Sequence, residues 1–195
     1  MHALSVAAVL LINFFIAARN TVLIRRGDIK PSLAMWVFFS IAVAGSLGTY
    51  LSEGDFSPWD NILNTADLLL CTYVAVIIRL WGDRSTGFTR FDTGCLVAVL
   101  VILVFWAFTR EHATAHSLIQ LILVLAYFPV IKRLWNSREN TESFGVWAAL
   151  MLAPIFSLLS SKGTLATVYA VRAIVSTGLL MLLMARAERR SRNSP

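Results

Sequence analysis

Two opposite charges, Asp67 and Arg172, lie inside long apolar stretches of this 195-residue chain. A charged side chain at mid-depth in a bilayer costs roughly 3 kcal/mol on insertion scales, so such residues pair or face a polar interior. If both stretches are helices that run in the same direction, the two residues lie roughly 9 Å and 13 Å below the same face. We therefore expect an ion pair beside a central cavity. A purely structural pair and two separately hydrated charges are the alternatives.

Polar residues recur at helical spacing around both charges. A spacing of i, i+3 and i+7 places three side chains on one helix face. The rows are Asn64, Asp67 and Cys71; Tyr169, Arg172 and Ser176; and, at looser spacing, His116, Gln120 and Tyr127. Amides and a phenol bind hydroxylated or zwitterionic solutes through directional hydrogen bonds, and a guanidinium additionally favours a carboxylate or phosphate.

These rows predict one solute pocket between the helices. The residues that we expect to line it are Asn13, Asn64, Asp67, Gln120, Tyr127, Tyr169, Arg172 and Ser176. The alternative is that the amides only join neighbouring helices, a contribution of roughly 0.6 kcal/mol per contact.

Seven apolar spans are available to position these side chains. They cover residues 3–18, 32–51, 61–81, 94–109, 114–134, 143–160 and 164–185. Each is long enough, or nearly so, to cross a hydrocarbon core of about 30 Å. A helix satisfies its own backbone hydrogen bonds in lipid. The fold class expected is therefore an all-α membrane protein with seven transmembrane helices, and residues 1–195 form a single membrane domain.

The distribution of cations predicts an orientation in the membrane. Fourteen of the seventeen Lys and Arg residues fall in or at the edges of alternate gaps between the spans, counting the tail. Because cytoplasmic segments collect Lys and Arg, the N-terminus is expected outside and the C-terminus in the cytoplasm, with 188–195 as a basic cytoplasmic tail. The first span has no basic residue ahead of it, so we expect a retained helix rather than a cleaved signal.

The net charge of +6 follows from this insertion bias. Since the cations are spread over four short segments, we expect the lipid bilayer as partner and no nucleic acid. A bacterial inner (plasma) membrane is the location expected. The oligomeric state stays open, a homo-oligomer included.

The chain also contains a weak internal repeat. A shift of 107 positions lays the first span on the fifth and Asn13 on Gln120, and a shift of 105 lays Asp67 on Arg172. This pattern predicts a 3+1+3 parallel repeat about an axis along the membrane normal. The expected boundaries are 1–81 and 114–187 for the triple-helix repeats and 94–109 for the linker helix.

The end of the fifth span resembles a PQ-loop, in which a helix ends in Pro-Gln and a short basic loop leads to another helix. Residues 127–135 contain Pro129 and the basic pair Lys132 and Arg133, and residues 24–32 are similar to the matching stretch of small bacterial PQ-loop-like proteins. The resemblance covers most of the chain. It implies the seven-helix fold of the SWEET and SemiSWEET sugar transporters, with solute bound between the repeats.

The chain departs from this motif in both halves. Val130 stands in place of the Gln, and Val22 and Leu23 stand where the first half would have Pro-Gln. In the transporters that the chain resembles, the dipeptide is regarded as a hinge. We expect a carrier of a small polar solute (a sugar, amino acid or organic anion) that works by alternating access. The alternative is a non-transporting membrane receptor or assembly subunit with the same fold, as the KDEL receptor is in this superfamily.

The sequence lacks the residue patterns that several other functions require. Retinal needs a lysine in the middle of the last span, whereas all lysines lie at span ends: Lys30, Lys132 and Lys162. His112 and His116 are spaced i, i+4, but Glu111 lies outside the pair, unlike the zinc-protease pattern. We expect no cofactor, no metal and no enzymatic activity.

Overall fold

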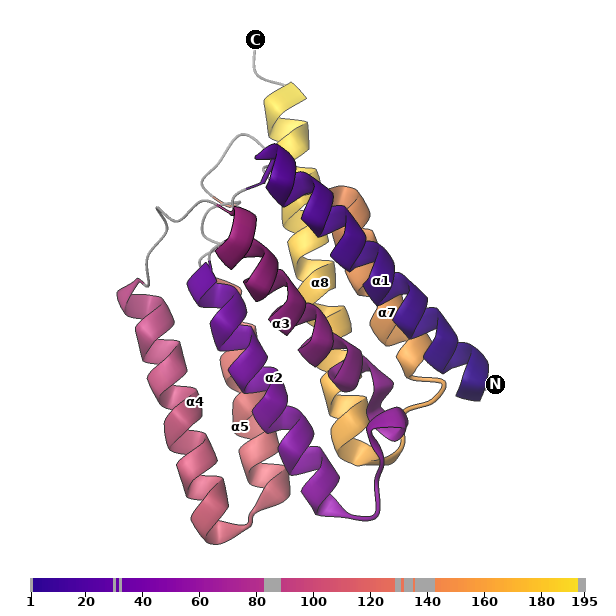
Figure 1. Ribbon diagram of the computed structural model, residues 1–195, viewed down its shortest axis with the longest axis vertical. Coiled ribbons are helices and arrows are strands. Elements are labelled where there is room, and N and C mark those ends of the chain that lie inside the picture. Colours follow the sequence, from indigo (N-terminus) through magenta and orange to yellow (C-terminus); the bar gives the residue numbers. More distant parts are fainter. Residues whose placement is uncertain are drawn as a thin grey trace.

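The structure is a computed structural model that describes residues 2–29, 31, 33–82, 89–128, 131, 135 and 143–192, with side chains to residue 189. This part of the chain contains seven α-helices and one short 3-10 helix (Figure 1). They are α1 (His2–Arg26), α2 (Leu33–Glu53), η1 (Pro58–Asn61), α3 (Ile62–Trp81), α4 (Arg90–Thr109), α5 (His112–Leu125), α7 (Phe144–Ser157) and α8 (Gly163–Arg192).

Some sequence-based expectations fall on residues outside this described part. They are the PQ-loop-like positions Pro129, Val130, Lys132 and Arg133, and the loop cations Lys30, Arg84 and Arg138.

Five helices are long and apolar enough to cross a membrane: α1, α2, α3 with η1, α4 and α8. The chain is therefore an integral membrane protein. The helices α5 and α7 are apolar but shorter, at 14 residues each. Within the expected span 143–160, α7 ends at Ser157, and a turn follows in which the Ser157 carbonyl accepts from the backbone N–H groups of Ser160 and Ser161.

Local signals set several helix ends. Thr89 and Asp92 form a capping box at the start of α4, with the Asp92 N–H donating to Thr89 Oγ1 at 3.1 Å. At the end of α1, Gly27 has a φ of 75°, and the Asp28 N–H returns to the Leu23 carbonyl at 3.0 Å. A residue with the left-handed backbone conformation at this position allows the last carbonyl groups of the helix to accept hydrogen bonds.

Six of the helices form a closed ring. In order around it, α1 packs on α3, α3 on α2, α2 on α5, α5 on α8, α8 on α7, and α7 on α1. The remaining helix, α4, lies outside the ring against α2 and α5 (Figure 1). The central core draws buried side chains from every helix of the ring and one, Val99, from α4.

A glycine on α2 brings α4 close. A Cβ atom on Gly45 would lie 2.6 Å from Leu103 Cδ2. Only Val99 of α4 is buried, so the helix turns most of its apolar surface outward, as expected of a helix in lipid.

Candidate functional site

Buried polar side chains from three helices meet a half-buried arginine from a fourth inside the ring. We call Ser46, Asn64, His116, Gln120 and Arg172 the central polar cluster. Ser46 of α2, Asn64 of α3 and His116 of α5 are completely enclosed, and Gln120 of α5 is 4% exposed. Arg172 projects from α8, nine residues after Gly163, which is roughly 14 Å along the helix. Arg172 therefore lies well inside the apolar layer.

The charge on Arg172 fixes the direction of the hydrogen bonds around Gln120. Arg172 Nε donates to Gln120 Oε1 at 3.1 Å, so the amide nitrogen must face the other way. That nitrogen donates to Ser46 Oγ at 2.8 Å and approaches His116 Nε2 at 3.3 Å. The His116 Nε2 is then an acceptor, and its Nδ1–H points at the Ser46 carbonyl, 3.2 Å away. The arrangement corresponds to a neutral His116 in one tautomer.

Asn64 ends the hydrogen-bond chain. Its amide is oriented so that Oδ1 accepts from Ser46 Oγ at 2.9 Å and Nδ2 donates to the Val43 carbonyl at 3.1 Å. The chain thus runs from Arg172 through Gln120 and Ser46 to Asn64, with each hydroxyl and amide partnered. It joins α8, α5, α2 and α3.

Tyr169 lies between the two intramembrane charges. Its hydroxyl donates to Asp67 Oδ2 at 2.9 Å, and the Arg172 guanidinium carbon lies 4.6 Å from the centre of its ring. Among the described residues no ion pair joins Asp67 to Arg172, so the predicted direct pair is replaced by a bridged one. The reason is local: Tyr169 is three residues before Arg172, and this spacing stacks the two side chains on one face of α8.

Tyr127 completes the charged part of the site. The residue follows the end of α5 and interacts electrostatically with Arg172. Its ring contacts Phe39 of α2 and Trp147 of α7, with centroid separations of 5.8 and 6.2 Å. The structure therefore connects six of the predicted site residues: Asn64, Asp67, Gln120, Tyr127, Tyr169 and Arg172.

Two predicted site residues lie apart from this network. Asn13 is buried on α1, where its Nδ2 donates to the Val9 carbonyl at 3.0 Å and its Oδ1 has no partner among the described residues. Ser176 is buried on α8 one turn beyond Arg172. In the part of the chain that the structure describes, no hydrogen bond ties either side chain to the central polar cluster.

Sequence reasoning left Ser46 out of the site. This serine accepts from Gln120, donates to Asn64 and offers its carbonyl to His116, so it is the hub of the cluster. Its only sequence signal is one hydroxyl among several in an apolar helix, beside Gly45. Such a hydroxyl usually bonds the carbonyl of its own preceding turn, and only the neighbouring helices reveal the different role of Ser46.

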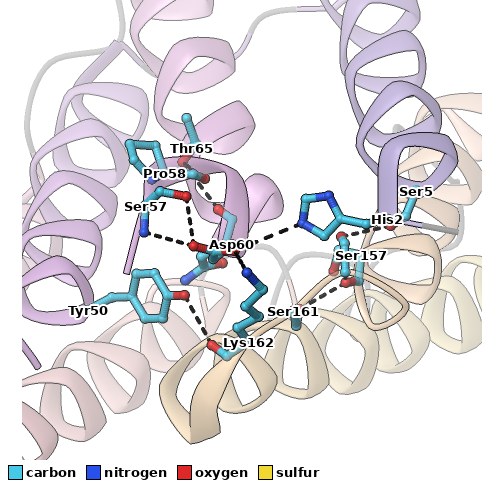
Figure 2. Close-up of polar contacts among 12 residues, drawn as sticks. His2, Ser5, Tyr50, Ser57, Pro58, Asp60, Thr65, Ser157, Ser161 and Lys162 are labelled. Atoms are coloured by element: carbon cyan, nitrogen blue, oxygen red, sulfur yellow. Dashed lines mark hydrogen bonds and ion pairs between the residues drawn. The ribbon is translucent and has the colours of Figure 1, made fainter. Parts of the chain in front are cut away.

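A second polar cluster lies at the end of the bundle that holds the N-terminus of α1 (Figure 2). We call Asp60, Lys162, Ser57 and Tyr50 the Asp60 cluster. Lys162 Nζ lies 2.6 Å from Asp60 Oδ1, and Ser57 donates to Asp60 Oδ2 from its N–H (2.9 Å) and its hydroxyl (2.7 Å). The Lys162 N–H donates to the Asp60 carbonyl, and Tyr50 donates to the Lys162 carbonyl, both at 3.0 Å.

The Asp60 cluster ties together two parts of the chain that are distant in sequence. It joins the connection between α2 and α3 to the connection between α7 and α8. The start of α1 is attached nearby, where Ser5 Oγ lies 2.8 Å from Ser160 Oγ. This end of the bundle is closed by direct contacts between side chains and backbone.

Neither cluster has the ligands of a metal site. Among the described residues, no group of three His, Cys, Asp or Glu side chains could hold a metal ion. Cys71 and Cys95 are free thiols. Comparison of the chain with protein-family models, with curated proteins and with solved structures gives no match.

Proposed function

We propose that this protein is a carrier that moves a small polar solute across the membrane by alternating access. The observation that carries the proposal is the Asp67–Tyr169–Arg172 arrangement, in which two opposite charges are held near each other inside the apolar layer without direct contact. A pair kept only for stability would gain most from direct contact. Charges held apart leave donors and acceptors that a solute can engage.

The order of helices around the ring supports a two-part carrier. In one group, α3 lies between α1 and α2; in the other, α8 lies between α7 and α5. In both groups the helix that is third in the chain is the middle one. Where the groups meet, the first helix of each packs on the second of the other: α1 on α7, and α5 on α2.

This exchange is the pattern expected of two parallel triple-helix repeats related by a two-fold axis along the membrane normal. We propose that the groups are such repeats in a divergent PQ-loop protein, with α4 as the linker. Asp67 and Arg172 belong to the two middle helices, so a solute between them would lie at the junction of the repeats.

The orientation proposed places the Asp60 cluster at the outer face. Arg25, Arg79 and Arg186 all lie at the opposite end of the bundle, and that end then faces the cytoplasm. In a bacterial inner membrane, the Asp60 cluster would close the outer side while solute exchanges with the cytoplasm. Opening to the outside would require Asp60 and Lys162 to separate.

Counterflow in proteoliposomes tests the carrier. Liposomes with purified protein are preloaded with unlabelled glucose, alanine or lactate, and entry of the same labelled compound is followed. At least one compound should enter faster than into protein-free liposomes, and Arg172→Gln should abolish the difference. The matched control is Ser117→Ala, on the exposed face of α5. The proposal is rejected if Arg172→Gln leaves every flux unchanged, or if no compound is carried.

A receptor or assembly subunit is the second candidate. One observation favours it: Asn64 and Gln120 have their hydrogen-bonding groups occupied by neighbouring helices, as in a static bundle. Affinity purification from the membrane in mild detergent would then retain one partner protein in fixed ratio, and the liposome assay would show no flux.

A further inference from the structure

The charges of the central site sum to zero. Asp67 and Arg172 are the acidic and basic residues there, and they interact electrostatically across Tyr169. The other titratable groups around them are Tyr127, Cys71 and His116. His116 is neutral in its hydrogen-bond arrangement, and a phenol and a thiol are neutral near pH 7. With its two ionised groups, the empty site is therefore overall uncharged.

A carrier must rearrange both with and without its solute. Rearrangement of a site with a net charge inside the apolar layer is costly, so both states are favoured only when each is neutral. A solute with one negative charge breaks this balance unless one positive charge accompanies it. The group in the site that can accept that charge is Asp67, by taking up a proton.

The donors that remain free point to the class of solute. The amides of Gln120 and Asn64 are already committed, so a polyol finds few directional partners. The Arg172 Nε is used by Gln120, and among the described residues no hydrogen bond engages the two outer nitrogens of the guanidinium, which leaves them for a ligand. A guanidinium edge matches a carboxylate in shape and charge. A phosphate, with more than one negative charge near pH 7, would need a second cation, and the described part of the cluster contains only Arg172.

We propose that the solute is a small monocarboxylate and that it moves with one proton, as an electroneutral symport. This inference rests on the proposed carrier function and specifies its substrate. The carboxylate binds the outer nitrogens of Arg172, and the proton adds to the Asp67 carboxylate to give the neutral acid. The loaded site holds Arg172 with the anion and protonated Asp67, so its net charge is again zero. On the opposite side both leave, and Asp67 is ionised once more.

The role of Tyr169 follows from this scheme. Its hydroxyl donates to the ionised Asp67 in the empty state, and its ring lies beneath the guanidinium. The residue therefore holds the two charges close enough to balance each other and far enough apart for an anion to reach Arg172. Tyr169 is a positioning residue in this scheme.

Proteoliposomes that contain pyranine, a pH-sensitive dye, test the proposal. External lactate, alanine or glucose is added at equal concentration, with the membrane potential clamped by potassium and valinomycin. Lactate should acidify the interior faster than in protein-free liposomes, and the rate should not change with the imposed potential. Alanine and glucose should cause no acidification. Labelled alanine or glucose uptake without proton entry would overturn the symport but leave the carrier standing, and the absence of all flux would overturn both.

Two substitutions separate the roles of the charges. With Asp67→Asn, an empty site would rearrange with a net positive charge, so lactate–lactate counterflow should persist while net acidification is lost. With Arg172→Lys, the positive charge remains but the guanidinium edge that matches a carboxylate is lost. The concentration of lactate for half-maximal rate should therefore rise about tenfold to a hundredfold. Ser117→Ala should match the wild type. If Asp67→Asn keeps lactate-driven acidification, the proposal is wrong; circular dichroism and gel filtration check that each variant is folded.

Discussion

The two polar clusters of this bundle use opposite charges in different ways. At the end of the bundle, Lys162 contacts Asp60 directly at 2.6 Å, and the lysine side chain is 61% exposed. In the apolar interior, Tyr169 separates Asp67 from Arg172, and neutral side chains take up the remaining contacts. Water screens an exposed pair, so direct contact there contributes little free energy. In the interior, each polar group that is left without a hydrogen-bond partner costs far more free energy.

This difference indicates which of the two clusters is the candidate functional site. The Asp60 cluster is explained by what it joins, because the contacts of Lys162 with Asp60 and Tyr50 link the connection between α7 and α8 to the connection between α2 and α3 and to the end of α2. The central polar cluster joins helices too, but it also keeps one cation and one carboxylate out of contact. Five substitutions test this contrast, and they are ordered by the size of the change expected in the free energy of unfolding.

The largest effect is expected for Gln120→Leu. The change removes the acceptor of Arg172 Nε and the donor to Ser46, and it leaves a charged donor unsatisfied in the interior. We expect a loss of about 2–3 kcal/mol in the free energy of unfolding, measured by titration with sodium dodecyl sulfate in mixed micelles. Ser117→Ala is the control on the same helix. A loss below that of the end-cluster variants would contradict the contrast.

A smaller effect is expected for Asp60→Ala. This variant loses the contact with Lys162 and the two hydrogen bonds from Ser57, for a total of about 1–2 kcal/mol. Lys162→Met removes only the exposed pair and should lose no more than about 1 kcal/mol. Added salt should reduce the difference in the free energy of unfolding between Lys162→Met and the wild type, because salt screens the exposed pair. Equal losses in the two variants would show that the Ser57 bonds contribute nothing.

Tyr169→Phe should cost about 0.6 kcal/mol, typical of one hydrogen bond between membrane helices. The ring remains beneath Arg172, and only the donor to Asp67 is lost. Titration with sodium dodecyl sulfate in mixed micelles measures this loss in the free energy of unfolding. A loss as large as that of Gln120→Leu would mean that the hydroxyl does more than position Asp67.

The smallest effect is expected for His2→Ala. His2 Nε2 lies 4.0 Å from Asp60 Oδ1, and the histidine side chain is 45% exposed (Figure 2). We expect a change of no more than about 0.2 kcal/mol at pH 7. A larger loss in the free energy of unfolding would show that the start of α1 contributes to the stability of the Asp60 cluster.

The sequence predicted some parts of the site and not others. Periodicity placed Asn64, Asp67, Tyr169 and Arg172 on helix faces that do meet. Periodicity did not include Asn13, a lone amide of the first span, and in the structure this amide donates to the Val9 carbonyl of its own preceding turn. The Asp60 cluster was not predicted at all, since its residues lie at the end of α2 and in two connections, and the approach of these segments depends on helix packing.

Length, hydropathy and charge order by themselves determined that this chain is a helical membrane protein and that Asp67 and Arg172 lie within its apolar layer. These properties are local, and lipid imposes the helix on any sufficiently apolar stretch. Only the tertiary structure decided the partner of each polar group, because this depends on the rotation and neighbours of each helix. It placed Tyr169 between the charges and made Ser46 the hub of the hydrogen bonds. No spacing in the sequence specifies either arrangement.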